Sequence, residues 1–212
     1  MKLPEDIIPC SLIKKGFVMN KILIACLVAT TIFFPLAASA DTTSYATFAN
    51  IPFGSTHAQV RHLTSLKGYV YDSVDSTSTS DIFKGTTDDV SSSVVAKFDN
   101  SNRLAKVIVI LGTADSEVQD KYTEVHDQLI NKYGTPNNDF HFYSDPYFAG
   151  DGYEQQALRL GKASFSAYWA QPNGYAQLSV EISTNLTVNV IYEGPSWHDY
   201  VQEHKANVSH DL

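Results

Sequence analysis

The strongest constraint on the fold is a pattern that occurs twice, in which two strand-like segments flank a short cluster of turn-forming residues. The strand-like segments are Val94–Phe98, Leu104–Leu111, Ser164–Ala170 and Tyr175–Ile182. The turn formers between them are Asp-Asn-Ser-Asn at 99–102 and Gln-Pro-Asn-Gly at 171–174. Alternating apolar residues on both sides of such turns are typical of β-hairpins. A third strand at Leu186–Tyr192 extends the second hairpin into an antiparallel meander.

The first predicted helix covers Thr56–Leu66. Thr56 and Gln59 fit a capping box, and Gly68 suits a left-handed helix stop. The segment that follows, Ser73–Ser80, is rich in serine and threonine and predicts a flexible loop or a solvated strand.

The second predicted helix has a clearer apolar stripe. Ser116 and Gln119 fit another capping box, and Gly134 and Pro136 end the segment. Apolar side chains recur between these ends at steps of three and four residues, at Val118, Tyr122, Val125, Leu129 and Tyr133. This spacing places them on one face of a helix, whose charged opposite face is predicted to be solvated.

Each predicted helix precedes a hairpin, which indicates two similar units at 48–112 and 115–193. At an offset of 71 residues, Phe98–Leu111 aligns with Trp169–Ile182, although alternation alone explains much of this match. An internal repeat is therefore a hypothesis. The predicted fold class is α+β: two helix-plus-β-hairpin or meander units packed as one antiparallel sheet, with the helices on one face and a short C-terminal helix.

The C-terminal helix is predicted because Ser196 and Asp199 can cap a short segment that carries Trp197. Residues 41–200 are predicted to form a single domain, and residues 201–212 a polar tail. A chain of this length buries enough surface to form a core without a metal or a disulfide.

The N-terminal residues 1–40 are typical of an extension followed by an export signal. Lys21 precedes an uncharged stretch, Ile22–Phe34, and the small residues Ala38-Ser39-Ala40 suit signal peptidase. The apolar stretch is short for a membrane span. We therefore expect cleavage after Ala40, a periplasmic or secreted protein, and no membrane span after cleavage.

Two points about this N-terminal region bear on the mature chain. Met19 is the expected translation start, because residues 1–18 fit no part of a signal. One alternative is open, since Leu23–Cys26 resembles a lipoprotein cleavage box in which Cys26 would carry the lipid. Apart from this case, the mature chain has no cysteine, because Cys10 and Cys26 both precede Asp41.

The expected mature chain is acidic. Over residues 41–212, 11 Lys and Arg residues stand against 21 Asp and Glu residues, a net charge of −10 with histidine neutral. Such a chain is repelled by nucleic acid and by anionic membranes, whereas it attracts a basic protein. The charge therefore indicates a basic protein as partner and no nucleic acid.

No motif indicates catalysis. The serine-hydrolase elbow, the phosphate-binding loop and the dinucleotide fingerprint are all absent from the sequence. His57 and His62 are five residues apart and diverge on a helix, so they do not form a metal-ligand pair. The sequence therefore predicts no enzyme activity, no cofactor and no metal site.

The densest functional candidate is the segment Asp139–Glu154, in which aromatic residues alternate with acids. Rings supply rigid apolar area and carboxylates pair with Lys or Arg, so this composition suits docking of a basic protein. The candidate partner-binding residues are Phe142, Tyr143, Asp145, Tyr147, Phe148, Asp151, Tyr153 and Glu154. Two alternatives are a strand at Phe140–Tyr143 with aromatics that only cover the sheet, and an ion or sugar site.

Three features carry a family resemblance: Ile51–Ser55 leading into the first helix, the helix exit Lys132–Pro136, and the paired hairpins. Over Phe48–Glu193 the layout resembles the α+β modules of β-lactamase inhibitor proteins and of small accessory lipoproteins of outer-membrane assembly. The resemblance implies a helix paired with an antiparallel sheet and a protein-binding role in the envelope. It assigns no site residue. The inhibitors rely on disulfides and the lipoproteins on an anchoring cysteine, neither of which the expected mature chain offers.

These observations favour an exported, non-catalytic protein-binding module, of the inhibitor or immunity type, directed against a basic envelope-acting enzyme. An alternative is a structural or assembly accessory of the envelope, whose sheet edge adds a strand to a partner. A second alternative is a hydrolase with a noncanonical carboxylate site.

Overall fold

The computed structural model describes residues 46–87, 90–170 and 176–210. These residues belong to the compact unit Thr43–Leu212. The expected extension and export signal at 1–40, and the turn predicted at 171–174, lie outside the described residues.

Strands dominate the described chain. The strands are β1 Val70–Thr77, β2 Ser80–Thr87, β3 Val90–Phe98, β4 Leu104–Leu111, β5 Asn138–Tyr143, β6 Ala163–Ala170, β7 Ala176–Ile182 and β8 Val188–Glu193. The α-helices are α1 His57–Ser65, α2 Val118–Tyr133, α3 Glu154–Arg159 and α4 Pro195–His210. Two short 3-10 helices, η1 Phe48–Asn50 and η2 Asp115–Glu117, complete the set.

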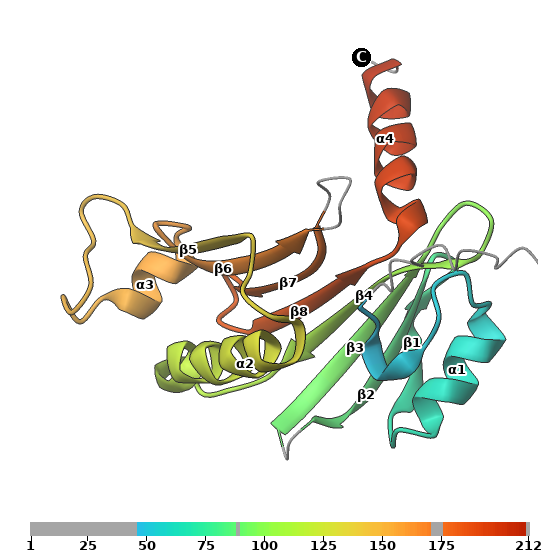
Figure 1. Ribbon diagram of the computed structural model, residues 1–212, viewed down its shortest axis with the longest axis horizontal. Coiled ribbons are helices and arrows are strands. Elements are labelled where there is room, and N and C mark those ends of the chain that lie inside the picture. The colour runs from blue at the N-terminus through green and yellow to red at the C-terminus, as the bar shows by residue number, and fades with distance from the viewer. Residues whose placement is uncertain (1–45, 88–89, 171–175, 211–212) are drawn as a thin grey trace, which may run out of the picture. The chain divides into compact units, whose positions relative to one another are not determined.

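All of these strands form one antiparallel sheet in the order β1-β2-β3-β4-β8-β7-β6-β5. Strands β4 and β8 meet in the middle, and β1 and β5 form the two edges. Helices α1 and α2 lie on the same face of the sheet (Figure 1). The predicted fold class is confirmed: an α+β protein with one antiparallel sheet, two of its helices, α1 and α2, on one face, and a C-terminal helix.

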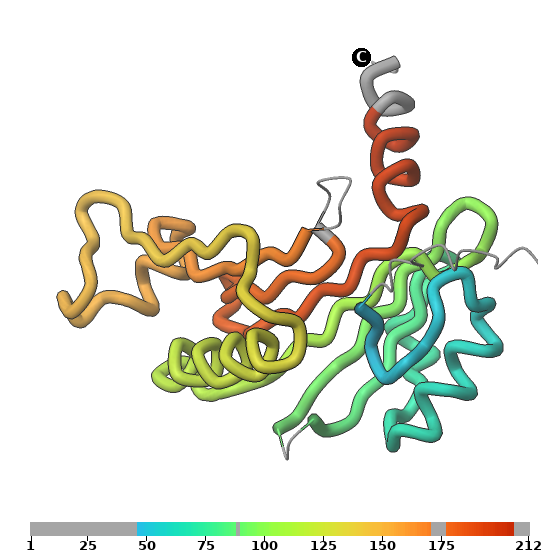
Figure 2. Tube along the Cα trace, viewed as in Figure 1, coloured from blue at the N-terminus to red at the C-terminus, as the bar shows by residue number. Residues whose placement is uncertain are grey.

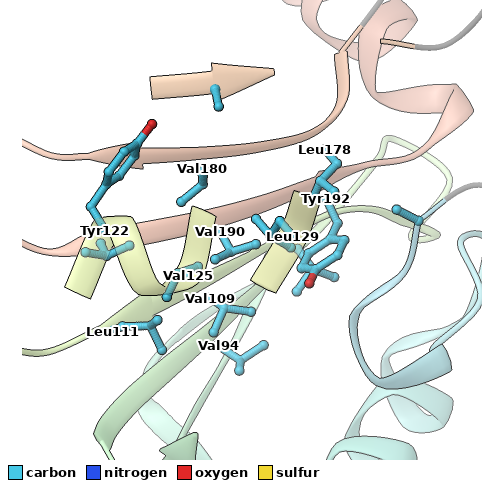
Figure 3. Close-up of a cluster of buried hydrophobic side chains, with 14 of the residues drawn as sticks. Val94, Val109, Leu111, Tyr122, Val125, Leu129, Leu178, Val180, Val190 and Tyr192 are labelled. Carbon is cyan, nitrogen blue, oxygen red and sulfur yellow. The ribbon is translucent and has the colours of Figure 1, made fainter. Parts of the chain in front are cut away.

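The core lies between α2 and the middle of the sheet. Val94, Val109, Val190 and Val180 are directly paired across β3, β4, β8 and β7, so their side chains share one face. The buried residues of the α2 stripe cover this row (Figure 3); they include Tyr122, Val125 and Leu129. Burying each such side chain stabilises the fold by about 1.5–3 kcal/mol. We call the sheet face that α1 and α2 cover the helix face.

Helix α1 begins as the sequence predicts. The Gln59 N–H donates to Thr56 Oγ1 at 3.4 Å, and the Thr56 N–H donates to Gln59 Oε1 at 2.9 Å, which completes the capping box. The helix is fixed to β2 by the fully buried carboxylate of Asp81, which accepts two hydrogen bonds from Arg61 at 2.9 and 2.7 Å. Gly68, at φ 83°, terminates the segment in the left-handed conformation.

The start of α2 differs from the prediction. No side-chain cap is present, because η2 occupies residues 115–117 and α2 begins at Val118 with Glu117 before it. The Gln119 amide donates instead to the Tyr143 hydroxyl on β5, at 3.1 Å. The second capping box is therefore wrong, since its Gln119 is used in a tertiary contact.

Three segments were predicted incompletely. The Ser/Thr-rich segment 73–80 lies in the β1–β2 hairpin, where the exposed outer strand needs few apolar residues. Helix α3 has no counterpart in the sequence prediction, because six residues are too few to show a helical period. Helix α4 is longer than expected and extends to His210, so most of the predicted polar tail is helical.

Each half of the chain contributes an α-helix and then four strands of the sheet, although helix α3 interrupts the second half between β5 and β6. The offset of 71 residues, however, aligns β3–β4 with β6–β7, and these strand pairs hold different places relative to the centre of the sheet. The strands in matching places are β3–β4 and β7–β8. The sequence match therefore reflects shared strand alternation rather than equivalent positions.

Among the residues described, no helix has the length and apolar character needed to span a bilayer.

Candidate partner-binding loop

The segment between β5 and α3, residues 144–153, extends beyond the strands at one end of the sheet (Figure 2), and we call it the binding loop. It begins where the Ser144 N–H donates to the Lys162 carbonyl at 2.7 Å, which continues the β5–β6 pairing by one residue. It ends where the Ala157 N–H donates to the Tyr153 carbonyl at 2.9 Å, the first turn of α3. Both ends are therefore tied to regular structure.

Carboxylates hold the backbone of the binding loop. Asp151 accepts hydrogen bonds from the N–H groups of Phe148 at 3.0 Å and Tyr153 at 2.7 Å, one on each oxygen. Glu154 accepts from the Gly150 N–H at 2.9 Å. Gly150 and Gly152 have φ of 80° and 81°, which favours glycine at both turn positions. The loop conformation is thus fixed by hydrogen bonds within the chain itself.

The loop encloses an open pocket of about 510 Å³. Its lining combines aromatic rings with polar groups: Pro146, Tyr147, Phe148, Gly150, Asp151, Tyr153 and Gln156. Phe148 and Tyr153 are 64% and 60% exposed, so much of their aromatic surface is accessible to solvent. Such an apolar hollow with a few fixed polar groups is the usual form of a binding site.

The structure brings together four of the eight predicted site residues in this pocket, namely Tyr147, Phe148, Asp151 and Tyr153. Pro146, Gly150 and Gln156 also line it, and sequence reasoning did not single them out. Among the predicted acids, Glu154 lies beside the pocket through its bond to Gly150. Asp145 is exposed, lies outside the pocket lining and makes no hydrogen bond or ion pair with the described residues.

Phe142 and Tyr143 diverge, because successive strand residues point to opposite faces. Phe142 is 50% exposed on the sheet face opposite the helices, which we call the open face. Tyr143 lies on the helix face, where its ring packs on Phe165 at 5.9 Å and its hydroxyl accepts from Gln119. Tyr143 therefore anchors β5 to α2, and Phe142 remains available for contact.

The acidic residues shape the electrostatics at the base of the loop. Burial raises the pKa of the Tyr143 phenol, and the nearby carboxylates of Glu154 and Asp151 push it in the same direction, against the hydrogen bond from Gln119. The negative charges of Glu154 and Asp151 thus both act on the Tyr143 hydroxyl. A cationic group in the pocket would meet this negative potential together with the faces of the aromatic rings.

A second polar cluster, absent from the sequence prediction, lies on the helix face. His126 of α2 is 8% exposed, and its Nε2 is 3.2 Å from Asp139 Oδ2 on β5, while His141 Nε2 is 3.2 Å from Asp139 Oδ1. The sequence signals for this cluster are the i, i+2 spacing of Asp139 and His141 on one strand face and the position of His126 four residues after Tyr122 of the α2 stripe. In the part of the chain that the structure describes, no group of three or more His, Cys, Asp or Glu residues is arranged to hold a metal ion.

Compared with protein-family models, curated proteins and solved structures, the chain matches none.

Proposed function

We propose that this chain is an exported, non-catalytic protein-binding module that docks a basic protein through the binding loop, as an inhibitor or immunity-type factor against an envelope-acting enzyme would. The observation that carries the proposal is the pre-formed aromatic pocket. Its walls include Phe148 and Tyr153, both more than half exposed, and its carboxylates already hold the loop backbone.

The pocket suits an anchor side chain such as Lys or Arg. The stem of either residue packs on aromatic rings, and its cationic head interacts with ring faces and with the carboxylates of Asp151 and Glu154. Because the loop is held by its own hydrogen bonds, little conformational entropy is lost on binding. Buried anchors of this kind carry most of the energy of a protein interface.

The open face of the sheet extends the contact surface. A row of partly exposed aliphatic residues crosses its middle at Ile82, Val95, Ile108 and Ile191, which are paired across β2, β3, β4 and β8. Phe142 faces the same side from β5. A partner anchored in the pocket can therefore spread over this face.

Charge governs the approach of the partner more than the final affinity. The net charge of −10 over residues 41–212 draws a cationic protein toward the chain at long range. Next to the pocket, Asp145 adds a carboxylate that has no ion pair with the described residues, so Asp145→Asn should slow association about two- to fivefold and weaken its salt dependence.

The test compares capture by the protein and by two variants. Native envelope and secretome extract is passed over the immobilised chain at low salt, eluted with a salt step and analysed by mass spectrometry. In one variant Phe148→Ala and Tyr153→Ala remove the pocket walls, and neither side chain holds the loop backbone. In the control, Leu160→Ala removes a side chain of similar exposure, 59%, that lies outside the pocket lining.

We expect a basic protein to be retained by the unaltered chain and by the control, and lost from the double variant. Removing two aromatic anchors should weaken binding by about 2 kcal/mol each, roughly 30-fold in Kd per residue. Equal retention by all three proteins would exclude the pocket as the docking site. Retention of no basic protein by any of them would reject the proposed function itself.

A further inference from the structure

The outer edge of β5 is an unpaired sheet edge. Residues Asn138–Tyr143 pair with β6 on one side in an unbroken register of six residues, and no described strand lies on the other side. Five of the six residues are exposed. An edge of this kind is a ready template for another strand, and proteins usually protect it.

The opposite edge, β1, carries such protection. Its register shifts between Asp72 and Thr77, and the Ser76 hydroxyl bonds both to the Asp72 carbonyl and to the Ile82 N–H within the irregularity. Lys84 forms ion pairs with Asp72 and Asp75 beside this strand. Strand β5 has no bulge, no proline and no lysine. The two edges of one sheet therefore differ in the feature that prevents strand addition.

Successive side chains of β5 point alternately to the two faces of the sheet. Phe140 and Phe142, 44% and 50% exposed, face the open side of the sheet. Asp139 and His141 face the helix side, an acid and a base two residues apart. A strand laid antiparallel to β5 would meet aromatic rings on one face and a carboxylate and an imidazole on the other.

Backbone geometry limits the registers that such a strand can adopt. The Ser144 N–H bonds to Lys162 in line with the β5–β6 pairing, so the backbone groups of Phe142 and Phe140 also point toward β6. Those of Asp139 and His141 consequently point outward. An added antiparallel strand must align its own outward groups with these two residues.

We propose that the β5 edge pairs with β5 of a second copy of this chain, antiparallel, around a two-fold axis at Phe140. In this register Asp139 lies opposite His141 of the second copy, and the reverse contact is made by symmetry. The backbone N–H and C=O groups of Asp139 and His141 point away from β6, so they can form hydrogen bonds with the same groups of the second copy. The two Phe140 rings then meet on the open face.

The contact between the Asp139 carboxylate and the His141 imidazole, together with the direction of the backbone groups, selects both the second copy and the register. A shift of one residue would bring outward backbone groups opposite groups that point toward β6, so the ladder could not form. A shift of two residues would place His141 opposite itself and Asp139 opposite Tyr143, so the acid–base pair would be lost. The edge is thus complementary to itself in one arrangement, as a two-fold interface requires.

Cysteine cross-linking tests this arrangement residue by residue. The full chain is used with Cys10→Ser and Cys26→Ser, which leaves no other cysteine. With Phe140→Cys added, the two sulfur-bearing residues face each other at a Cα separation of about 4.5 Å, within disulfide range. With Phe142→Cys as the matched control, each cysteine faces Asn138 and lies about 13 Å along the strand from its counterpart.

We expect an oxidised dimer with Phe140→Cys and at least tenfold less with Phe142→Cys. Cross-linking favoured at residue 142, or equal at both, would overturn the register. Sedimentation of chains with both phenylalanines intact checks that association needs no engineered cysteine. In the same sedimentation experiment, Phe140→Lys should weaken dimerisation at least tenfold. Val74→Lys, at an exposed apolar position of β1, should leave dimerisation unchanged. A monomer at every concentration would reject the proposal, including the case in which the edge takes a strand from a different protein.

Discussion

Asp72 shows how one surface carboxylate can hold an irregular strand. Its side chain pairs with Lys84 and accepts the backbone N–H groups of Asp75 and Val74 at 3.2 and 3.0 Å. The hydrogen bond with Lys84, followed by those two backbone donors, lowers the pKa of Asp72 from 3.8 to about 2. All of these groups favour the ionised form, so Asp72 stabilises the fold while it is charged.

Asp72 should therefore contribute to acid sensitivity. Because its folded pKa is depressed, its contribution is present above the ordinary value of 3.8 and is lost as the pH falls toward about 2. We expect its carboxyl carbon to titrate near the lower value in an NMR experiment. We also expect Asp72→Asn to flatten the fall in unfolding free energy over this range. Asp145→Asn, which removes an exposed carboxylate that has no ion pair among the described residues, is the matched control for the loss of one carboxylate.

The two capping boxes that the sequence predicts differ in the structure. Thr56 caps α1, whereas Ser116 lies in η2 and caps nothing. Thr56→Ala should therefore lower the free energy of unfolding by about 1 kcal/mol, and Ser116→Ala by less than about 0.5 kcal/mol. Urea unfolding of both variants measures this difference. Equal losses would mean that Ser116 stabilises the start of α2 by a contact that this structure lacks.

Sequence patterns predicted the elements that have strong local signals. The α2 stripe and the β3–β4 hairpin were predicted within a few residues, because both bury one face and turn or cap residues mark their ends. Residues 73–80 of the β1–β2 hairpin fit a loop as well as a strand, since they are polar and lie near a sheet edge, where packing imposes little pattern.

The candidate site was predictable in composition but not in arrangement. The aromatic and acidic residues of 139–154 were identified, yet their directions depend on where β5 ends. Because β5 ends at Tyr143, Phe142 and Tyr143 point to opposite faces. The roles of Asp151 and Glu154 in holding the loop depend on backbone turns at Gly150 and Gly152, which composition alone does not reveal.

One buried cluster spans both halves of the described chain. It includes Val60 of α1, Leu129 of α2, and side chains of β4 and β8, where the two halves are paired. A continuous core of this kind predicts one cooperative unfolding transition rather than two.

Val190→Ala tests this cooperativity at the β4–β8 junction. Val190 is 6% exposed, and removing its two methyl groups should lower the free energy of unfolding by about 2 kcal/mol. Hydrogen exchange should then accelerate equally for the slowest amides of β3 and of β7. Val74→Ala, at an 89% exposed position, should change neither strand. Faster exchange in β7 alone would show that the halves unfold independently.

The order of the sheet also has a consequence for how the chain is made. Every described strand pairing joins consecutive strands except β4–β8, whose paired residues Lys106 and Glu193 are 87 positions apart. Closing so long a loop is slow compared with forming the hairpins. While the chain emerges from the ribosome, β4 is therefore an open edge until β8 is synthesised, and its apolar residues Val107 and Val109 stay uncovered on that side. The nascent chain is most vulnerable to mispairing during this interval, which ends when β8 pairs with β4.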